Sequence, residues 1–160
     1  MIAVAVVAIL AVIAIPAFFS QSRKSKASSE TSAMMAEMST KEEQYKIDNA
    51  AYRTTATCPT SVTSQQQSFA TCLAGSDWSA LHINPPETKG YCQYTITAGS
   101  AGASPSPTSP FHMASDGSDA VAQSWFYIIA ACDMDGDGSA NGLYFMSSVD
   151  TKIQTQNEGK

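Results

Sequence analysis

The pattern of apolar and polar positions divides the chain into an apolar N-terminal segment and a remainder in which apolar and polar residues are mixed. The first nineteen residues, MIAVAVVAILAVIAIPAFF, carry no charge and include a single proline, Pro16. A helix that crosses a bilayer needs about 20 apolar residues, so this run has the length of a membrane-spanning or otherwise fully buried helix. Residues 20–26, SQSRKSK, follow it and hold three of the chain's nine basic residues.

Beyond this basic segment the pattern becomes that of an amphipathic helix. One apolar stripe has members three, four or seven positions apart, which is the spacing of a helix with one buried face; it consists of Ala27, Thr31, Met34, Met38 and Tyr45. We assign the polar residues to the other faces: Lys41, Glu42, Glu43 and Lys46. The buried face is predicted to pack on a sheet.

The absence of proline and glycine between residues 17 and 51 predicts one continuous helix that ends near 49–52. At 1.5 Å per residue such a helix is a rod of about 75 Å, which a small head cannot cover. Pro16 removes one backbone hydrogen bond, so we expect a kink there or local melting over residues 11–15. The apolar half must then be buried in lipid or against other copies of the chain.

The rest of the chain is predicted to form a single small head. Residues 53–90 are irregular in pattern, with a short helical turn around Trp78 and Leu81 that plugs the head. Residues 91–97, 120–132 and 143–149 are predicted strands. The fold class is therefore α+β, a long N-terminal helix on an antiparallel sheet of three to four strands. We divide the chain into 1–26, the apolar half of the helix, 27–52, its amphipathic half, and 53–160, a head made of loop 53–90 and sheet 91–160.

The four cysteines predict two disulfides. They form no CxxC pair and have no histidine at ligand spacing, which speaks against zinc. An even number of cysteines behind an apolar leader indicates an oxidising compartment. Of the three pairings we favour Cys58 with Cys72, which closes a short loop, and Cys92 with Cys132. Antiparallel pairing of the first two predicted strands brings the latter two together.

A cleaved secretory signal is the alternative interpretation of the apolar run. No basic segment precedes the run, and it exceeds the usual length of about 7–15 residues for the apolar part of such a signal. It also lacks an obvious cleavage site of small residues, since Pro16 is followed by Ala17 and two phenylalanines. These features favour a helix that is kept in the mature protein.

The distribution of charge argues against a nucleic-acid ligand. The net charge is −5, and from Gly90 onward there are seven acidic residues against two basic ones. Binding to phosphates requires a basic face, which this head lacks.

One acidic segment is a candidate calcium site. Asp133, Asp135 and Asp137 alternate and are followed by a glycine, which is how a calcium-binding loop of the EF-hand type begins. Position 12 of that template is Tyr144 rather than glutamate, so the EF-hand is incomplete. Further candidate ligands are Ser139, Asn141 and Asp150. The alternative is a solvated acidic turn, because Asp and Gly are ordinary turn residues.

Catalysis finds no support in the sequence, and we predict that the chain is not an enzyme. His82 and His112 are isolated, and no GxSxG, HExxH or phosphate-binding loop is present. The segment 99–110, GSAGASPSPTSP, is predicted to be an exposed loop. Its hydroxyl residues are candidate O-glycosylation sites: Ser104, Ser106, Thr108 and Ser109.

The apolar segment resembles the amino-terminal helix of bacterial type IV pilins and type II secretion pseudopilins, with Pro16 at the kinking proline. Residues 20–52, which contain EEQYKIDNAAY, resemble the end of the pilin helix and its exit. The resemblance implies that mature chains begin a few residues before the position of Met1, with a methylated phenylalanine and a glutamate. It also implies a leader removed by the prepilin peptidase.

From this resemblance we expect a structural subunit of an extracellular type IV pilus. The implied partners are copies of the chain in a helical filament, the inner membrane before assembly, and the pilus assembly machinery. Adhesion and motility are functions of the family. The calcium-like loop favours a pseudopilin, whereas the larger head, the second disulfide and the Ser/Pro loop favour a pilus. A secreted or anchored calcium-binding module that does not polymerise is the third hypothesis.

Overall fold

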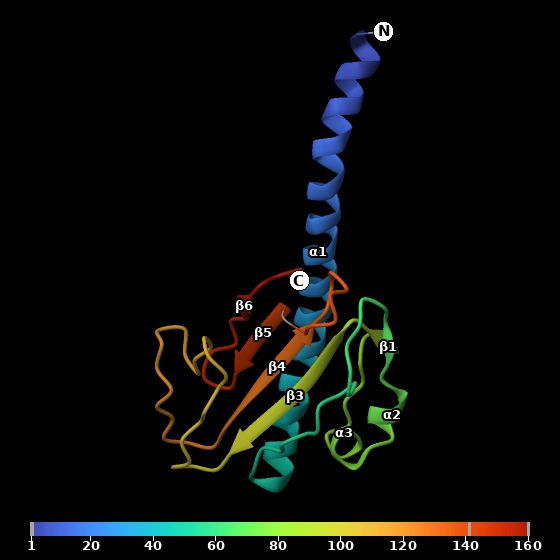
Figure 1. Cartoon of the computed structure of the whole chain (residues 1–160). Helices are drawn as coiled ribbons and strands as arrows, with labels where there is room; N and C mark the ends of the chain where they lie inside the picture. The colour runs from blue at the N-terminus through green and yellow to red at the C-terminus, as the bar shows by residue number, and fades with distance from the viewer. Residues whose placement is uncertain (1, 141, 160) are drawn as a thin grey trace.

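The structure is a computed structural model that describes residues 2–140 and 142–159. Within the first helix the side chains of residues 2–17, 19 and 20 lie outside the described set. Helix α1 runs over Ile2–Asn49 and projects far beyond the head at its amino-terminal end, as Figure 1 shows. The head gathers around the other half of the helix, and its C-terminal end returns to the middle of α1.

Helix α1 passes through Pro16 without a break. The local melting expected over residues 11–15 is therefore not found, because a proline interior to a helix removes one hydrogen bond without ending the helix. The kink at Pro16 stays a prediction, since that side chain lies outside the described residues. At its other end α1 stops at Asn49, where Ala50 has a φ of 57°, within the predicted exit 49–52.

A four-stranded antiparallel meander packs against the lower half of α1. Its strands, in spatial and chain order, are β3 (Cys92–Gly99), β4 (Trp125–Cys132), β5 (Gly142–Ser147) and β6 (Gln154–Gln156). A smaller sheet pairs β1 (Gln67–Ser68) with β2 (Lys89–Gly90). Along the chain, two short helices lie between β1 and β2: α2 (Ala70–Leu73) and α3 (Ser76–Ala80). The predicted α+β class, a long helix on an antiparallel sheet, is confirmed.

The predicted strands are found with shifted boundaries. The second begins at Trp125 and not at residue 120, because its partner β3 ends at Gly99, directly opposite Trp125. Residues 120–124 have no partner strand and belong to the preceding loop. The predicted plug is found at α3, where Trp78 and Leu81 are buried. The small sheet of β1 and β2 was not predicted from the sequence.

The main sheet is covered on both faces. Between it and α1 lies the main core, which includes Met34, Met38, Tyr94, Phe126 and Ile128. On the opposite face a second cluster is covered by the 100–124 loop; its buried members are Phe111, Met113, Trp125, Tyr127 and Phe145. Strand β4 is therefore buried on both sides, which explains its continuous apolar sequence instead of an alternating one.

The helical stripe is confirmed, but one residue assigned to a polar face is buried as well. Ala27, Thr31, Met34 and Met38 are buried, and Tyr45 packs at the edge of the core. Glu42, however, was assigned to a polar face and is wholly inaccessible to solvent. It lies four residues after Met38 and seven after the buried Met35, so helical periodicity places it on the buried face. The backbone N–H of Arg53 donates to its carboxylate at 3.0 Å, which partly compensates its burial.

Candidate functional site

The amino-terminal part of α1 is a candidate interaction surface. Residues 2–20 extend beyond the head in Figure 1. Phe18, whose side chain is described, is 71% exposed. Where side chains are described, no helix is long and apolar enough to cross a membrane. The run 1–19 that was predicted to do so lies almost wholly outside that set.

Arg23 and Lys24 of α1, here called the basic neck, lie beside the C-terminal end of the chain. Arg23 and Lys24 line a pocket of about 560 Å³ together with Asp135 and Glu158. A Cβ added at Gly159 would lie 2.6 Å from the side chain of Lys24, so the chain end passes close to the helix. The basic neck of α1 therefore lies close to both the acidic loop and the C-terminal segment.

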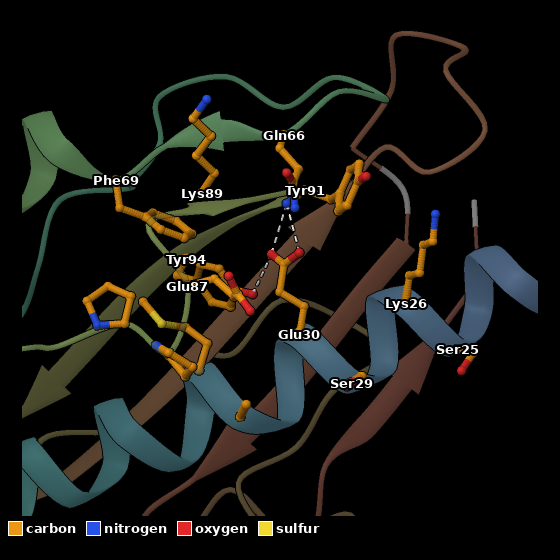
Figure 2. A pocket seen from close by; sticks show the side chains of 14 residues that line it. Ser25, Lys26, Ser29, Glu30, Gln66, Phe69, Glu87, Lys89, Tyr91 and Tyr94 are labelled. Atoms are coloured by element: carbon orange, nitrogen blue, oxygen red, sulfur yellow. Dashed lines mark hydrogen bonds between the residues drawn. The ribbon is translucent and has the colours of Figure 1, made fainter.

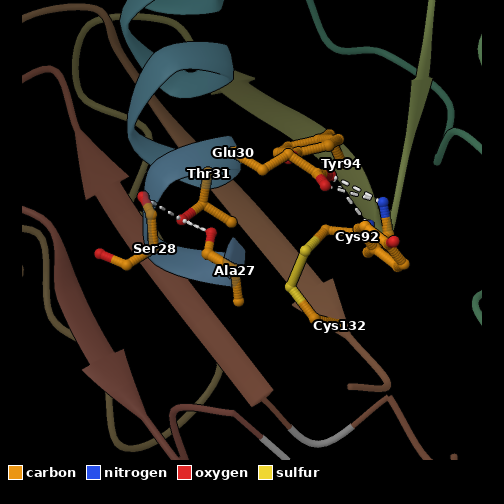
Figure 3. Close-up of a disulfide and its surroundings, with 8 residues drawn as sticks. Ala27, Ser28, Glu30, Thr31, Cys92, Tyr94 and Cys132 are labelled. Carbon is orange, nitrogen blue, oxygen red and sulfur yellow. Dashed lines mark hydrogen bonds between the residues drawn. A yellow bond between two sulfur atoms is a disulfide. The ribbon is translucent and has the colours of Figure 1, made fainter. Parts of the chain in front are cut away.

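Glu30 fastens the helix to the sheet, as Figures 2 and 3 show. Its carboxylate accepts hydrogen bonds from the backbone N–H of Tyr91 (2.8 Å to Oε2), the N–H of Cys92 (3.0 Å) and the hydroxyl of Tyr94 (3.0 Å). Burial raises the pKa of the Glu30 carboxyl, although these three donors act in the opposite direction. One side chain thus satisfies three donors at the start of β3.

We expect Glu30→Ala to lower the free energy of unfolding by about 2–4 kcal/mol, because three donors in a partly buried site lose their acceptor. Urea titration of the full chain in detergent, followed by the fluorescence of the buried Trp78 and Trp125, measures the change. Glu37→Ala is the matched control, since among the described residues Glu37 accepts the N–H of Asn84 alone; this substitution is expected to cost less than about 1 kcal/mol. Equal losses in the two variants would contradict this assignment to Glu30.

A groove opens between α1 and the segment 66–91, on the outer side of Glu30 (Figure 2). Its volume is about 570 Å³. Apolar side chains form its floor, among them Met34, Phe69 and Tyr94, and small residues of α1 form one wall. Lys26 and Lys89 stand at its edges and are exposed. The groove has the size and the mixed lining of a ligand-binding cleft.

The three predicted calcium ligands do come together. Asp133, Asp135 and Asp137 each offer a carboxylate oxygen within 4.8 Å of the others. Asp133 is buried and accepts the N–H groups of Gly136 (2.8 Å) and Gly138 (3.2 Å). Both glycines have a positive φ, 77° and 85°, which lets the backbone fold around this carboxylate. Oxygen ligands at this spacing suit Ca²⁺.

The other candidate calcium ligands differ in their position relative to the aspartate cluster. Ser139 lies next to the cluster and its N–H donates to Asp137 at 2.8 Å. Asp150 is not part of the cluster, because its carboxylate accepts the N–H groups of Ser115 and Lys152, and these bonds direct it to another loop. Asn141 lies outside the described residues.

Both disulfides have the predicted pairing, Cys58–Cys72 and Cys92–Cys132. Cys92 and Cys132 face each other across β3 and β4 and are fully buried beside α1 (Figure 3). Cys58 forms an isolated bridge with Tyr94 of β3, so its disulfide ties the 58–72 loop to the sheet.

The Ser/Pro loop lies as a strap over the second aromatic cluster. Trp125 Nε1 donates to the carbonyl of Ala103 at 2.8 Å, and the Tyr127 hydroxyl donates to the carbonyl of Ser106 at 3.4 Å. The residues facing this cluster are half-buried, and the candidate glycosylation residues are exposed: Ser104, Ser106, Thr108 and Ser109. The prediction of an exposed loop therefore holds for its hydroxyl groups and not for its whole surface.

The histidines do not form a catalytic arrangement within the described part of the chain. His112 Nδ1 lies 3.0 Å from Asp119, which also accepts the N–H of Met113. These contacts lower the pKa of Asp119, the backbone hydrogen bond having the larger effect. Both side chains are partly exposed, and the pair holds a loop. His82 is exposed at the end of α3.

Together these features define an α+β protein: a long N-terminal helix, half of it uncovered, on a four-stranded antiparallel sheet with two disulfides. Comparison with family models, curated proteins and solved structures finds no match to the chain. The architecture is consistent with a pilin-like fold. Sequence reasoning missed Glu30 and the groove, because both depend on contacts between α1 and residues about 60 positions later.

Proposed function

We propose that this chain is a structural subunit of an extracellular type IV pilus filament and polymerises through its N-terminal helix. The observation that carries the proposal is the geometry of α1. The helix has 48 residues, and the head packs only along its second half. The uncovered half has an apolar sequence, and each aliphatic side chain buried between copies would contribute about 1.5–3 kcal/mol.

The assembly route follows from the same segment. A free apolar helix of this length requires lipid before it is buried between subunits, so the precursor pool resides in the inner membrane. The pilus assembly machinery moves subunits from that pool into the filament. Disulfides are consistent with a head that folds in an oxidising compartment outside the cytoplasm.

Shearing the cell surface and analysing the filament fraction tests this function. We expect the chain in that fraction, with a mature amino terminus upstream of Met1 that begins with a methylated phenylalanine. Absence from the fraction, or an amino terminus downstream of Phe19, would reject a filament subunit.

The aspartate cluster favours a second candidate function, that of a type II secretion pseudopilin. Calcium held by Asp133, Asp135 and Asp137 would stiffen the loop that joins β4 and β5. A pseudopilin would be recovered with the secretion apparatus and would be missing from surface filaments. A calcium-binding module that never polymerises would be monomeric after extraction in detergent.

Calcium binding by the cluster has its own test. For an extracellular site with a dissociation constant near 10⁻⁴ M, 2 mM Ca²⁺ stabilises the fold by roughly 1–2 kcal/mol, which raises the Tm by several degrees. We expect this shift in the native chain and not in Asp135→Asn. Asp116→Asn is the control, because Asp116 is also an aspartate before a glycine but lies exposed in another loop. An equal shift with Mg²⁺, or no shift with Ca²⁺, would contradict a calcium site.

A further inference from the structure

The end of α1 carries an exposed apolar side chain that nothing in the described chain covers. Ile47 is 82% exposed, the highest value among the large apolar residues with described side chains. Glu43 and Asp48 lie near it and are exposed as well, while Lys46, the residue before it, donates to the Tyr52 hydroxyl, which in turn donates to Glu43. A single exposed isoleucine is ordinary on a protein surface. Ile47 is of interest here only if a second copy of the chain has a surface that could bury it.

The groove beside Glu30 offers a complementary surface. Its floor is apolar, and exposed Lys26 and Lys89 stand at its edges. Two carboxylates also line it. Glu30 is already bound to three donors, and Glu87 is the exposed one. An isoleucine with acidic side chains near it therefore fits a groove with an apolar floor and lysines at its edges.

The lengths along α1 allow the two surfaces to meet in a filament. Ile47 lies seventeen residues beyond Glu30, a distance of about 25 Å along the helix axis. The uncovered part of α1, residues 2–20, is about 28 Å long. A neighbour displaced toward the amino terminus by about 25 Å would thus place its head beside the uncovered helix and its Ile47 level with the groove.

We infer that the groove between α1 and the 66–91 segment receives Ile47 of a second copy of this chain, with Lys26 and Lys89 close to the neighbour's Glu43 and Asp48. This inference rests on the proposed filament function and adds the contact between heads. The two surfaces differ, so the contact is heterologous. A heterologous contact whose rotation does not close a ring generates an open helical polymer.

Cysteine cross-linking in sheared filaments tests the contact. All four native cysteines are paired, so Ala33→Cys in the groove and Ile47→Cys in one chain supply the only free thiols. Mild oxidation is expected to give a ladder of disulfide-linked multimers on a non-reducing gel. Ala33→Cys with Val149→Cys is the matched control and is expected to stay monomeric, since Val149 is exposed in the turn that follows β5.

Charge reversal tests the same contact without new thiols. Lys26→Glu alone and Asp48→Lys alone are each expected to lower filament yield, and the double variant is expected to restore it. Ile47→Asp is expected to reduce the yield about tenfold or more, because an apolar contact is lost and a charge is buried. Trp78 and Trp125 fluorescence of the chain extracted in detergent establishes that each variant is folded.

The outcomes separate this inference from the proposed function. Filaments that form normally but give no ladder, together with no rescue by the double charge reversal, would overturn the contact and leave the filament function standing. Failure of the native chain to appear in filaments would overturn both. A ladder confined to the Ala33 and Ile47 pair, with rescue, would support the contact.

Discussion

Removal of the Cys92–Cys132 disulfide by a double substitution to alanine is expected to lower the free energy of unfolding by about 4 kcal/mol. The bond closes a loop with a sequence separation of 40, and a cross-link of that length restricts the unfolded chain by about this amount. Both cysteines are fully buried between α1 and the sheet, so the substitution also leaves unfilled volume in the core. Urea titration with tryptophan fluorescence measures the change.

The second disulfide supplies the matched comparison. Its sequence separation is 14, for which the same relation gives about 3 kcal/mol. The double alanine variant at Cys58 and Cys72 is therefore expected to be the more stable of the two variants. A larger loss on removing Cys58–Cys72 would contradict this order and would mean that the 58–72 loop matters more to the fold than the link between β3 and β4.

Glu42→Gln is expected to stabilise the protein at pH 8 by about 3 kcal/mol and to have little effect at pH 4.5. Burial raises the pKa of the Glu42 carboxyl from 4.5 to about 7, and neighbouring Glu43 adds to the shift, whereas the Arg53 N–H and guanidinium oppose it. Between pH 4.5 and about 7 the Glu42 carboxyl keeps its proton in the folded chain and releases it in the unfolded chain. The free energy of unfolding therefore falls as pH rises through this window, by about 1.4 kcal/mol per unit.

The stability of the native chain and of the variant, measured by urea titration from pH 4.5 to 8, tests this expectation. Glutamine keeps the carbonyl oxygen that accepts the N–H of Arg53 but cannot ionise. A smaller slope remains in the variant, because burial also raises the pKa of Glu30. Asp48→Asn, an exposed position on the same helix, is the control and should leave the profile unchanged. An unaltered slope in Glu42→Gln would show that Glu42 is ionised in the folded chain.

The features that follow from local pattern could be predicted from the sequence. The helix stripe, the three longer strands and the plug at Trp78 all rest on periodicity or on composition within a few residues. The pairing of Cys92 with Cys132 follows from strand order, since antiparallel neighbours meet at opposite ends. The candidate calcium ligands Asp133, Asp135 and Asp137 could be predicted because their alternate spacing in the sequence is that of a calcium-binding loop.

The features that depend on distant contacts could not be predicted. Glu42 has the charge of a surface residue, and its burial is compensated by the Arg53 N–H eleven positions later. Glu30 likewise resembles any helical glutamate until β3 is placed beside it. Strands β1 and β2 have two residues each, too few to carry a periodic pattern, and they pair across more than twenty residues.

The double burial of β4 has a consequence for how such a protein can evolve. The strand separates two apolar layers, one shared with α1 and one formed beneath the Ser/Pro strap. Changes at Phe111 or Met113, or insertions in the strap, alter the outer layer while the helix-facing layer keeps its contacts. Distant sites that share no partners change stability nearly independently. The outward face can therefore diversify in sequence under selection by its surroundings, while the surface that packs on α1 stays the same.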